Sequence, residues 1–461
     1  MEPQLPPALI ESLQNAPGFN EAAFRKLHDS GEQVVSVRLN PAKASNLTEI
    51  AALKDLIQEK VPWSSNGFYL KQRPSFTLDP LFHAGVYYVQ EASSMFLEQA
   101  ITQSCDIKKP LRVLDLCAAP GGKSTLIQSV ISEETLLVSN EVIKTRANIL
   151  AENMSKWGSA NVIVSNNDPE HFKRLEEFFD LIVVDAPCSG SGLFRKDPAA
   201  IEEWSLNNVA LCSQRQQKIL ADIHGCLKPG GILIYSTCSY SEKEDEEIAD
   251  WLLEQFEFES MPLTTEPGWG IVESISKIKS AFGYRFYPDK VKGEGFFIAV
   301  FKKKGLSPEW RERRPNKKPA LLTKSEEDVI QPFIIDPEKY NLIKWQDEVL
   351  AIPRGMLFDF LYLQSVLYLK KAGVLIGSII RNELLPHHEW AMSTIAAAIL
   401  PRVEVPRDQA LDYLRRNEIK FNADVKGWAL VTHEQTTLGL VKILPNRINN
   451  YYPREWRILN K

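Results

Sequence analysis

The chain contains 461 residues, of which 44% are hydrophobic and 25% are charged, a balance typical of a globular protein with several domains. No apolar run approaches the ~18 residues that a membrane-spanning helix needs, and the first residues lack a secretory signal, so we expect a cytoplasmic protein without a membrane partner. The net charge of −5 combines 28 basic and 40 acidic residues in 1–300 with 26 basic and 19 acidic residues in 301–461, so only the C-terminal part is basic. The six cysteines show no Cys-x-x-Cys pair and no metal-site spacing, so neither disulfides nor a bound metal is expected.

Residues 1–100 mix short helical and strand-like patterns, as in RKLHDSGEQVVSVRLNP (25–41), and are expected to form a small N-terminal domain. Arg38 and Asn40 are polar residues in or beside a strand-like run. Their types are equally compatible with a functional role and with a structural one.

Residues 101–305 alternate between strand-like and helical patterns. Helical periodicity covers 144–158 and 207–231. Short runs rich in β-branched residues or leucine occur at 111–117, 134–141, 160–168, 179–187 and 231–238. This alternation predicts an α/β fold with a doubly wound parallel sheet.

Acidic and cysteine side chains stand where these strands end. Ligands of doubly wound sheets bind beyond the carboxyl ends of the strands, so these positions are candidates for a binding site. They are Cys117, Glu141, Asp168, Asp185 and Cys238.

The first strand leads into the loop DLCAAPGGKSTLI (115–127). A phosphate loop of the G-x-x-x-x-G-K-[ST] type needs glycine where this chain has Cys117, so a nucleoside triphosphate is disfavoured. The Pro120-Gly121-Gly122 turn allows close backbone approach to a ligand before a helix that is expected to start near Ser124. An amino-acid carboxylate suits this positive helix end beside Lys123.

The next two strand ends complete a cofactor site. Glu141 is placed to accept hydrogen bonds from both hydroxyls of a ribose, and Asp168 is placed to bind an adenine amino group. Ribose, adenine and an amino-acid tail together describe S-adenosylmethionine. A generic dinucleotide site is the alternative, and the loop sequence disfavours it.

Two cysteines at strand ends differ from the rest. Cys212 and Cys226 lie within a helical pattern and are expected to be core residues. Cys188, in DAPCSGSG, and Cys238, in YSTCSY, instead reach the rim of the predicted site. A thiol beside a methyl donor indicates covalent catalysis on an electron-poor ring carbon such as cytosine C5, which thiol addition at C6 makes nucleophilic.

These residues resemble a known family, the Sun/Nop2 RNA 5-methylcytosine methyltransferases. The matching signatures are LDLCAAPGGKS, DAPCSGSG and YSTCS, and further matches at 37–43, 87–95 and 293–303 extend the resemblance over roughly 35–305. It implies a Rossmann-like S-adenosylmethionine-dependent methyltransferase core. DNA cytosine methyltransferases are expected to use the cysteine that follows proline as the nucleophile, whereas the Thr-Cys-Ser element favours RNA.

The resemblance also implies roles for single residues. Cys238 resembles the nucleophile and Cys188 the cysteine that assists product release, while Asp185 would bind the cytosine edge near the methyl group. The cofactor would be held by Asp185 together with Cys117, Ala118, Ala119, Pro120, Gly121, Gly122, Lys123, Glu141 and Asp168.

The C-terminal part is expected to comprise a basic linker over 306–325 and an RNA-binding region over 326–461. The apolar stretch 356–380 contains Asp359 and two lysines, so it is interpreted as core and not as a membrane span. The stretch 438–458 interleaves arginines with Tyr451, Tyr452 and Trp456, a pattern that suits phosphate contact and base stacking, although a packed β-rich terminus would also contain such residues.

This tail resembles that of the ribosomal branch of the family, whose members modify small-subunit (16S) rRNA and end in a PUA-like RNA-binding domain. Removal of the tail is expected to weaken RNA binding far more than cofactor binding. Three alternatives remain: a tRNA cytosine-C5 methyltransferase, a catalytically inactive RNA-binding ribosome assembly factor, and a methyltransferase acting on an exocyclic nitrogen or on protein. The last commonly uses an Asn/Asp-Pro-Pro-Tyr/Phe motif where this chain has Asp185-Ala186-Pro187-Cys188.

Overall fold

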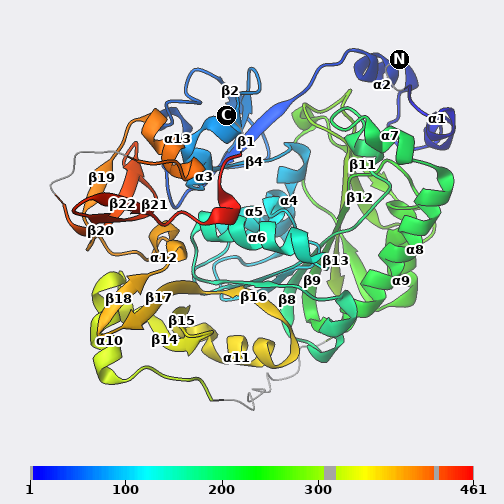
Figure 1. Ribbon diagram of the computed structural model, residues 1–461. Coiled ribbons are helices and arrows are strands. Elements are labelled where there is room, and N and C mark those ends of the chain that lie inside the picture. The colour runs from blue at the N-terminus through cyan, green and yellow to red at the C-terminus, as the bar shows by residue number, and fades with distance from the viewer. Residues whose placement is uncertain (1–3, 306–317, 420–424, 460–461) are drawn as a thin grey trace.

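The computed structural model describes residues 4–305, 318–419 and 425–459. Its centre is a ten-stranded mixed sheet (Figure 1) in which nine strands follow the order β11-β12-β13-β9-β8-β5-β6-β7-β16, and β10 pairs with β13. The parallel strands are β5 (Arg112–Asp115), β6 (Leu136–Asn140), β7 (Val162–Ser165), β8 (Phe179–Asp185) and β9 (Leu227–Thr237). Antiparallel strands complete one side: β10 (Phe258–Met261), β11 (Val272–Ile275), β12 (Phe282–Phe286) and β13 (Phe296–Lys303). The predicted doubly wound sheet is confirmed.

Two hydrophobic layers cover this sheet because its side chains alternate between the faces. In β8, Ile182 and Val184 join one layer, whereas Leu181 and Val183 join the other. The first layer contains α8 (Leu206–Ile223), α9 (Glu246–Gln255) and α11 (Leu357–Val366). The second contains α4 (Leu97–Ser104), α5 (Gly122–Val130) and α6 (Lys144–Trp157). The carboxyl ends of the parallel strands therefore form a rim between two packed layers.

The helix predicted over 207–231 ends earlier than expected. Helix α8 stops at Ile223, and β9 already begins at Leu227. Gly230 adopts a positive φ of 77°, and the pairing with β8 is irregular at this point, so glycine permits a bulge where the sequence suggested continued helix. Cys226 is buried, as predicted, but lies in the 3-10 turn between the two elements, whereas Cys212 is buried within α8.

The N-terminal part forms helices and a four-stranded sheet of order β2-β3-β1-β4. Arg38, in β1, is 1% exposed and donates hydrogen bonds to Thr125 Oγ1 (2.6 Å) and Ser129 Oγ (2.9 Å) of α5. Asn40 is fully buried and donates to the carbonyls of Gly85 and Trp157. Both residues thus have a structural role, fixing this sheet against the core. The elements are α1 (Pro7–Leu13), α2 (Glu21–Asp29), α3 (Pro80–His83), β1 (Val35–Leu39), β2 (Ile57–Lys60), β3 (Gly67–Leu70) and β4 (Tyr87–Val89).

The C-terminal part forms two further four-stranded sheets, of orders β14-β15-β17-β18 and β19-β20-β21-β22. The first contains β14 (Tyr340–Trp345), β15 (Glu348–Pro353), β17 (Val374–Ile380) and β18 (Glu383–Pro386), beside α10 (Lys324–Ile330) and α12 (His388–Met392). The second contains β19 (Arg402–Glu404), β20 (Gly427–His433), β21 (Thr436–Leu444) and β22 (Arg447–Asn450), beside α13 (Arg407–Arg415). Of the predicted basic linker, residues 306–317 lie outside the described residues.

The two ends of the chain share one hydrophobic core. Val37 and Leu39 of the N-terminal sheet belong to the same buried cluster as Val431 and Val441 of the C-terminal one, and Figure 1 shows α3 beside α13. Lys43 joins three parts of the chain, because its ammonium donates to the carbonyls of Ala84 (2.8 Å), Lys156 (2.5 Å) and Met392 (2.8 Å). The terminal sheets are thus packed together on the core.

Strand β16 (Leu369–Ala372) extends the central sheet from the C-terminal part of the chain. It pairs antiparallel with β7, with Leu369 opposite Ser165 and Ala372 opposite Ile163. The predicted core character of 356–380 is confirmed, since α11, β16 and β17 all contribute buried side chains. A truncation at residue 305 would remove an edge strand of the central sheet, so we expect it to affect the core as well as RNA binding.

The aromatic residues near the C-terminus are not all available for stacking. Tyr452 is fully buried in the core shared by the two ends, in ring contact with Tyr413 and His388, so its interpretation as a stacking residue is wrong. Tyr451 is 39% exposed and packs on Trp428. None of the helices in the described ranges combines the length and apolar character needed to cross a membrane.

Candidate active site

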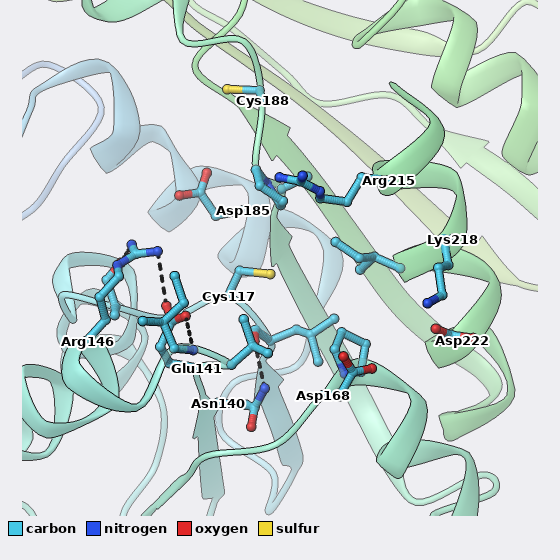
Figure 2. A pocket seen from close by; sticks show the side chains of 18 of the residues that line it. Cys117, Asn140, Glu141, Arg146, Asp168, Asp185, Cys188, Arg215, Lys218 and Asp222 are labelled. Carbon is cyan, nitrogen blue, oxygen red and sulfur yellow. Dashed lines mark hydrogen bonds and ion pairs between the residues drawn. The ribbon is translucent and has the colours of Figure 1, made fainter. Parts of the chain in front are cut away.

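A pocket of about 780 Å³ opens at the carboxyl ends of the parallel strands. Figure 2 shows Glu141 and Arg146 on one side and Arg215 and Lys218, from α8, on the other. All the strand-end candidates line this pocket: Cys117, Glu141, Asp168, Asp185 and Cys238, with Cys188 at the same rim. The structure therefore brings these residues together at one pocket.

The loop after β5 forms one wall of this pocket. Cys117 and Ala119 line the pocket, and the backbone N–H of buried Ala118 donates to the Asn140 carbonyl at 2.8 Å. Gly121 has a φ of 119°, which side-chain-bearing residues rarely adopt, and directly precedes α5. The helix therefore begins at Gly122, two residues before the predicted start near Ser124. Pro120, Gly121 and Gly122 form the turn and are not among the lining residues.

Lys123 has a partner within the site. Its Nζ lies 2.8 Å from Asp185 Oδ2, and the hydroxyl of Ser236 donates to Asp185 Oδ1 at 2.9 Å. Burial lowers the pKa of Lys123, but the charge and hydrogen bond of Asp185, together with the nearby charge of Asp115, outweigh burial and raise the pKa. The sequence placed Lys123 beside an amino-acid carboxylate, whereas the structure pairs it with a carboxylate of the chain itself.

The acids that follow the second and third parallel strands are both held by contacts within the chain. Glu141 is 2% exposed, and its Oε1 accepts the Ile143 N–H at 2.9 Å, while its Oε2 lies 3.4 Å from Arg146. Asp168 Oδ1 accepts the Glu170 N–H at 3.0 Å, which caps a 3-10 turn. Each carboxylate is thus oriented before a ligand arrives.

The two rim cysteines are in direct contact. Cys188, after β8, and Cys238, after β9, place their sulfur atoms 3.1 Å apart, and both are free thiols. The hydrogen bond with Cys238 and burial together raise the pKa of Cys188 well above its usual value. Either sulfur can act as the hydrogen-bond donor in this contact, so a proton can pass between the two thiols.

Two buried residues that support the site were missed by sequence reasoning. Asn140 donates to the carbonyls of Leu116 (3.2 Å) and Asn167 (2.9 Å), so it joins the loops after three strands. Glu244 lies behind the cysteines in the charge-rich stretch SEKEDEE (241–247). Asn140 immediately precedes a predicted ligand and could have been found from that position, whereas nothing distinguishes Glu244 from its acidic neighbours.

The site also fits S-adenosylmethionine by its chemistry. The pocket combines an apolar wall of Leu116 and Ala119 with two oriented carboxylates at successive strand ends, which suits a nucleoside with a diol and an amino group. Together with the doubly wound sheet, these features define a Rossmann-like, S-adenosylmethionine-dependent methyltransferase with a thiol pair at the rim of its pocket.

Comparison with known proteins gives the family. Models described as 16S rRNA methyltransferase RsmB/F, the N-terminal domain of 16S rRNA methyltransferase RsmF and the methyltransferase RsmF PUA domain match residues 104–302, 5–92 and 400–458. Two relatives from Aliivibrio fischeri, strains ES114 and MJ11, are both called ribosomal RNA small subunit methyltransferase F. They are 31% and 30% identical to this chain, and each alignment covers 91% of this chain and 90% of the relative.

A solved structure agrees with this result. The crystal structure of a methyltransferase homolog protein from Pyrococcus horikoshii matches with 29% identity and a TM-score of 0.51, covering 65% of this chain and all of that one. The chain belongs to the ribosomal RNA small subunit methyltransferase F family. The predicted resemblance to the ribosomal branch of RNA methyltransferases is confirmed.

Proposed function

We propose that this protein methylates C5 of cytosine in small-subunit rRNA through a covalent bond between Cys238 and cytosine C6. The observation that carries the proposal is the pair of thiols 3.1 Å apart, facing a pocket that contains Asp185 and the cofactor-site acids. Methylation of an exocyclic nitrogen or of protein needs no thiol, so it leaves this pair unexplained. The rRNA substrate rests on the names of the relatives.

The thiol pair supplies the chemistry that cytosine lacks. The Cys238 thiolate forms a bond to C6, and the electron pair of the C5–C6 double bond moves to C5 and makes it a nucleophile. Bound S-adenosylmethionine supplies an electrophilic methyl group beside this carbon. After C5 has taken the methyl group, a base removes the C5 proton, the double bond reforms, and the bond between Cys238 and C6 breaks.

Cys188 and Asp185 have separate proposed roles. Cys188 lies 3.1 Å from the Cys238 sulfur, and its proposed role is to assist the elimination that frees the product. Asp185 accepts a hydrogen bond from the cytosine amino group and is held in position by Lys123 and Ser236. The side chain of Asp185 is 35% exposed, which leaves it open to a base that has flipped out of its stack.

We propose that the cofactor binds along the carboxyl ends of the parallel strands. Glu141 binds the ribose hydroxyls and Asp168 the adenine amino group. The backbone of residues 117–123 contacts the amino-acid end. We further propose that residues 1–100 and 326–461 bind RNA on either side of a catalytic domain over 101–305, and that the protein acts in the cytoplasm on the RNA of the small subunit.

Release of tritium from RNA labelled at cytosine C5 tests this function. The wild-type protein, with S-adenosylmethionine and small-subunit rRNA, is expected to release tritium in step with methyl incorporation. Methyl incorporation without tritium release would contradict C5 as the target. Methylation of tRNA in preference to rRNA would show that tRNA is the substrate. A lack of any methyl transfer would favour an RNA-binding assembly factor. Bisulfite sequencing of rRNA from a strain that lacks the gene would identify the modified position.

A further inference from the structure

A buried carboxylate connects the two cysteine loops from behind. Glu244 is fully buried and is not among the residues that line the pocket. Its Oε1 accepts the Ser189 N–H at 2.7 Å, and its Oε2 accepts the hydroxyls of Ser189 and Ser239, both at 2.6 Å. Ser189 directly follows Cys188 and Ser239 directly follows Cys238, so one carboxylate holds the neighbours of both thiols.

A third segment joins the same network. The Gln216 amide, from α8, donates to the Pro187 carbonyl at 3.1 Å and to Glu244 Oε1 at 3.4 Å. A backbone contact also joins the loops, because the Gly192 N–H donates to the Cys238 carbonyl at 2.8 Å. The side chain of Glu244 adds a bridge between the residues that directly follow the two cysteines.

We propose that Glu244 is a positioning residue, which fixes the spacing of the Cys188 and Cys238 thiols by accepting hydrogen bonds from both of their loops. The catalytic meaning of this spacing rests on the proposed function, in which one thiol attacks and the other assists release. The spacing itself does not depend on that function.

The chemistry of the contacts explains why a carboxylate is needed. All the groups that face Glu244 are donors, namely one backbone N–H, two hydroxyls and one amide, and an ionised carboxylate is a pure acceptor with two oxygens. Hydrogen bonds to a charged acceptor are about twice as strong as neutral ones. Burial raises the pKa of Glu244, and the hydrogen bonds from Ser189 and Ser239 oppose this shift. Glutamine in the same place would turn an N–H toward one of the donors.

Disulfide formation measures the thiol spacing without any RNA. Diamide takes two electrons and two protons from the Cys188 and Cys238 thiols, forms the S–S bond and is itself reduced to the hydrazine. Peptide mapping by mass spectrometry follows the linked pair over time. In Glu244→Gln we expect at least a tenfold slower linkage than in the wild type, with unchanged binding of S-adenosylmethionine by calorimetry.

Asp250→Asn is the matched control. Asp250 is a buried carboxylate on α9 that accepts hydrogen bonds from Ser276 Oγ, Ile278 N and Lys279 N, but it contacts neither cysteine loop. Its substitution should leave the linkage rate within twofold of wild type. If Glu244→Gln melts below the assay temperature, Ser239→Ala removes one of the bonds to Glu244 Oε2 and is expected to slow linkage about threefold.

The catalytic readout separates positioning from general stability. Glu244→Gln should lower kcat more than tenfold and leave the KM for RNA within threefold. It should also accumulate some covalent RNA adduct, because Cys188 is no longer positioned to assist cleavage of the bond between Cys238 and cytosine C6. Linkage at the wild-type rate in folded Glu244→Gln and Ser239→Ala would overturn the proposal. If the wild-type protein releases no tritium, the proposed function is rejected. Slower disulfide formation in Glu244→Gln would in that case still support the positioning role.

Discussion

The rim that contains Cys188 and Cys238 and the edge formed by β7 and β16 belong to the same sheet. The residues that meet at these two places are separated by very different lengths of sequence. The sulfur contact joins residues 50 apart in the sequence, and both cysteines stand in recognisable motifs. At the sheet edge, the backbone of Tyr368 exchanges two hydrogen bonds of 3.0 Å with the side chain of Asn167, 201 residues away. The two cysteines thus lie in motifs that the sequence shows directly, whereas the asparagine that precedes Asp168 is held by the backbone of the tail.

A hydrogen-bond network connects the β7–β16 edge of the sheet to the cofactor pocket. The side chain of Asn140 donates to the Asn167 carbonyl and accepts the Asn167 N–H, and Asn140 is followed by Glu141, just as Asn167 is followed by Asp168. Each proposed cofactor acid therefore follows an asparagine of one continuous hydrogen-bond network that ends at Tyr368. The following experiments perturb this edge, the pocket and the basic tail in turn.

Deletion of residues 306–461 is expected to have the largest effect. It removes β16 and the buried side chains of α11 from the central sheet and its core. We expect the truncated protein to lose cooperative unfolding and measurable cofactor binding, as followed by circular dichroism and calorimetry. A folded truncation with wild-type affinity for S-adenosylmethionine would show that the core is independent of the tail.

Glu141→Ala and Asp168→Ala test the pocket directly. Each loses a charge-assisted hydrogen bond worth about 1.5–3 kcal/mol, which corresponds to roughly ten- to hundredfold weaker binding of S-adenosylmethionine. RNA affinity should stay unchanged. Glu170→Ala is a nearby control, because only its backbone N–H contacts Asp168. Normal cofactor binding in both variants would refute the assignment of the strand ends.

Asn167→Ala tests whether the edge supports the pocket. The substitution leaves the Tyr368 N–H without its acceptor at a part-buried position, which costs about 1–3 kcal/mol. We expect a lower melting temperature and about fivefold weaker cofactor binding, although Asn167 is not one of the proposed ligands. Asn341→Ala, which removes an exposed bond to the Arg354 carbonyl, should change neither quantity. A loss of stability without any loss of cofactor affinity would restrict Asn167 to folding.

Single arginines of the tail should have the smallest effects. Arg454 and Arg457 line an exposed recess with Arg415 and Arg416. Arg454→Ala is expected to weaken RNA binding about threefold and to flatten the slope of log affinity against log salt by roughly 0.7–0.9 if one phosphate contact is lost. Binding of the cofactor should not change. An unaltered salt slope, measured by fluorescence anisotropy, would show that this recess does not contact phosphate.

The sequence predicts some parts of the sheet and of the site but not others. Alternating strand and helix patterns define the parallel strands, and the strand ends identify Glu141, Asp185 and Cys238 because topology places them at one rim. Strand β16 could not be predicted, since an edge strand contributed from 200 residues away has no local signal. Tyr452 was misjudged because a buried ring and a stacking ring look alike in sequence. The role of Glu244 depends on two serines that only the fold brings together.

Covalent trapping of RNA tests the central claim most directly. Cys188→Ala can still attack and methylate, but it lacks the thiol that assists elimination, so it should remain bound to its methylated product. On denaturing gels with labelled small-subunit rRNA and S-adenosylmethionine, we predict a slowly migrating adduct for Cys188→Ala and none for Cys238→Ala, which should also release no tritium. An adduct formed by Cys238→Ala instead would reverse the two roles, and the absence of an adduct from both variants on RNA that the wild type methylates would contradict the covalent mechanism.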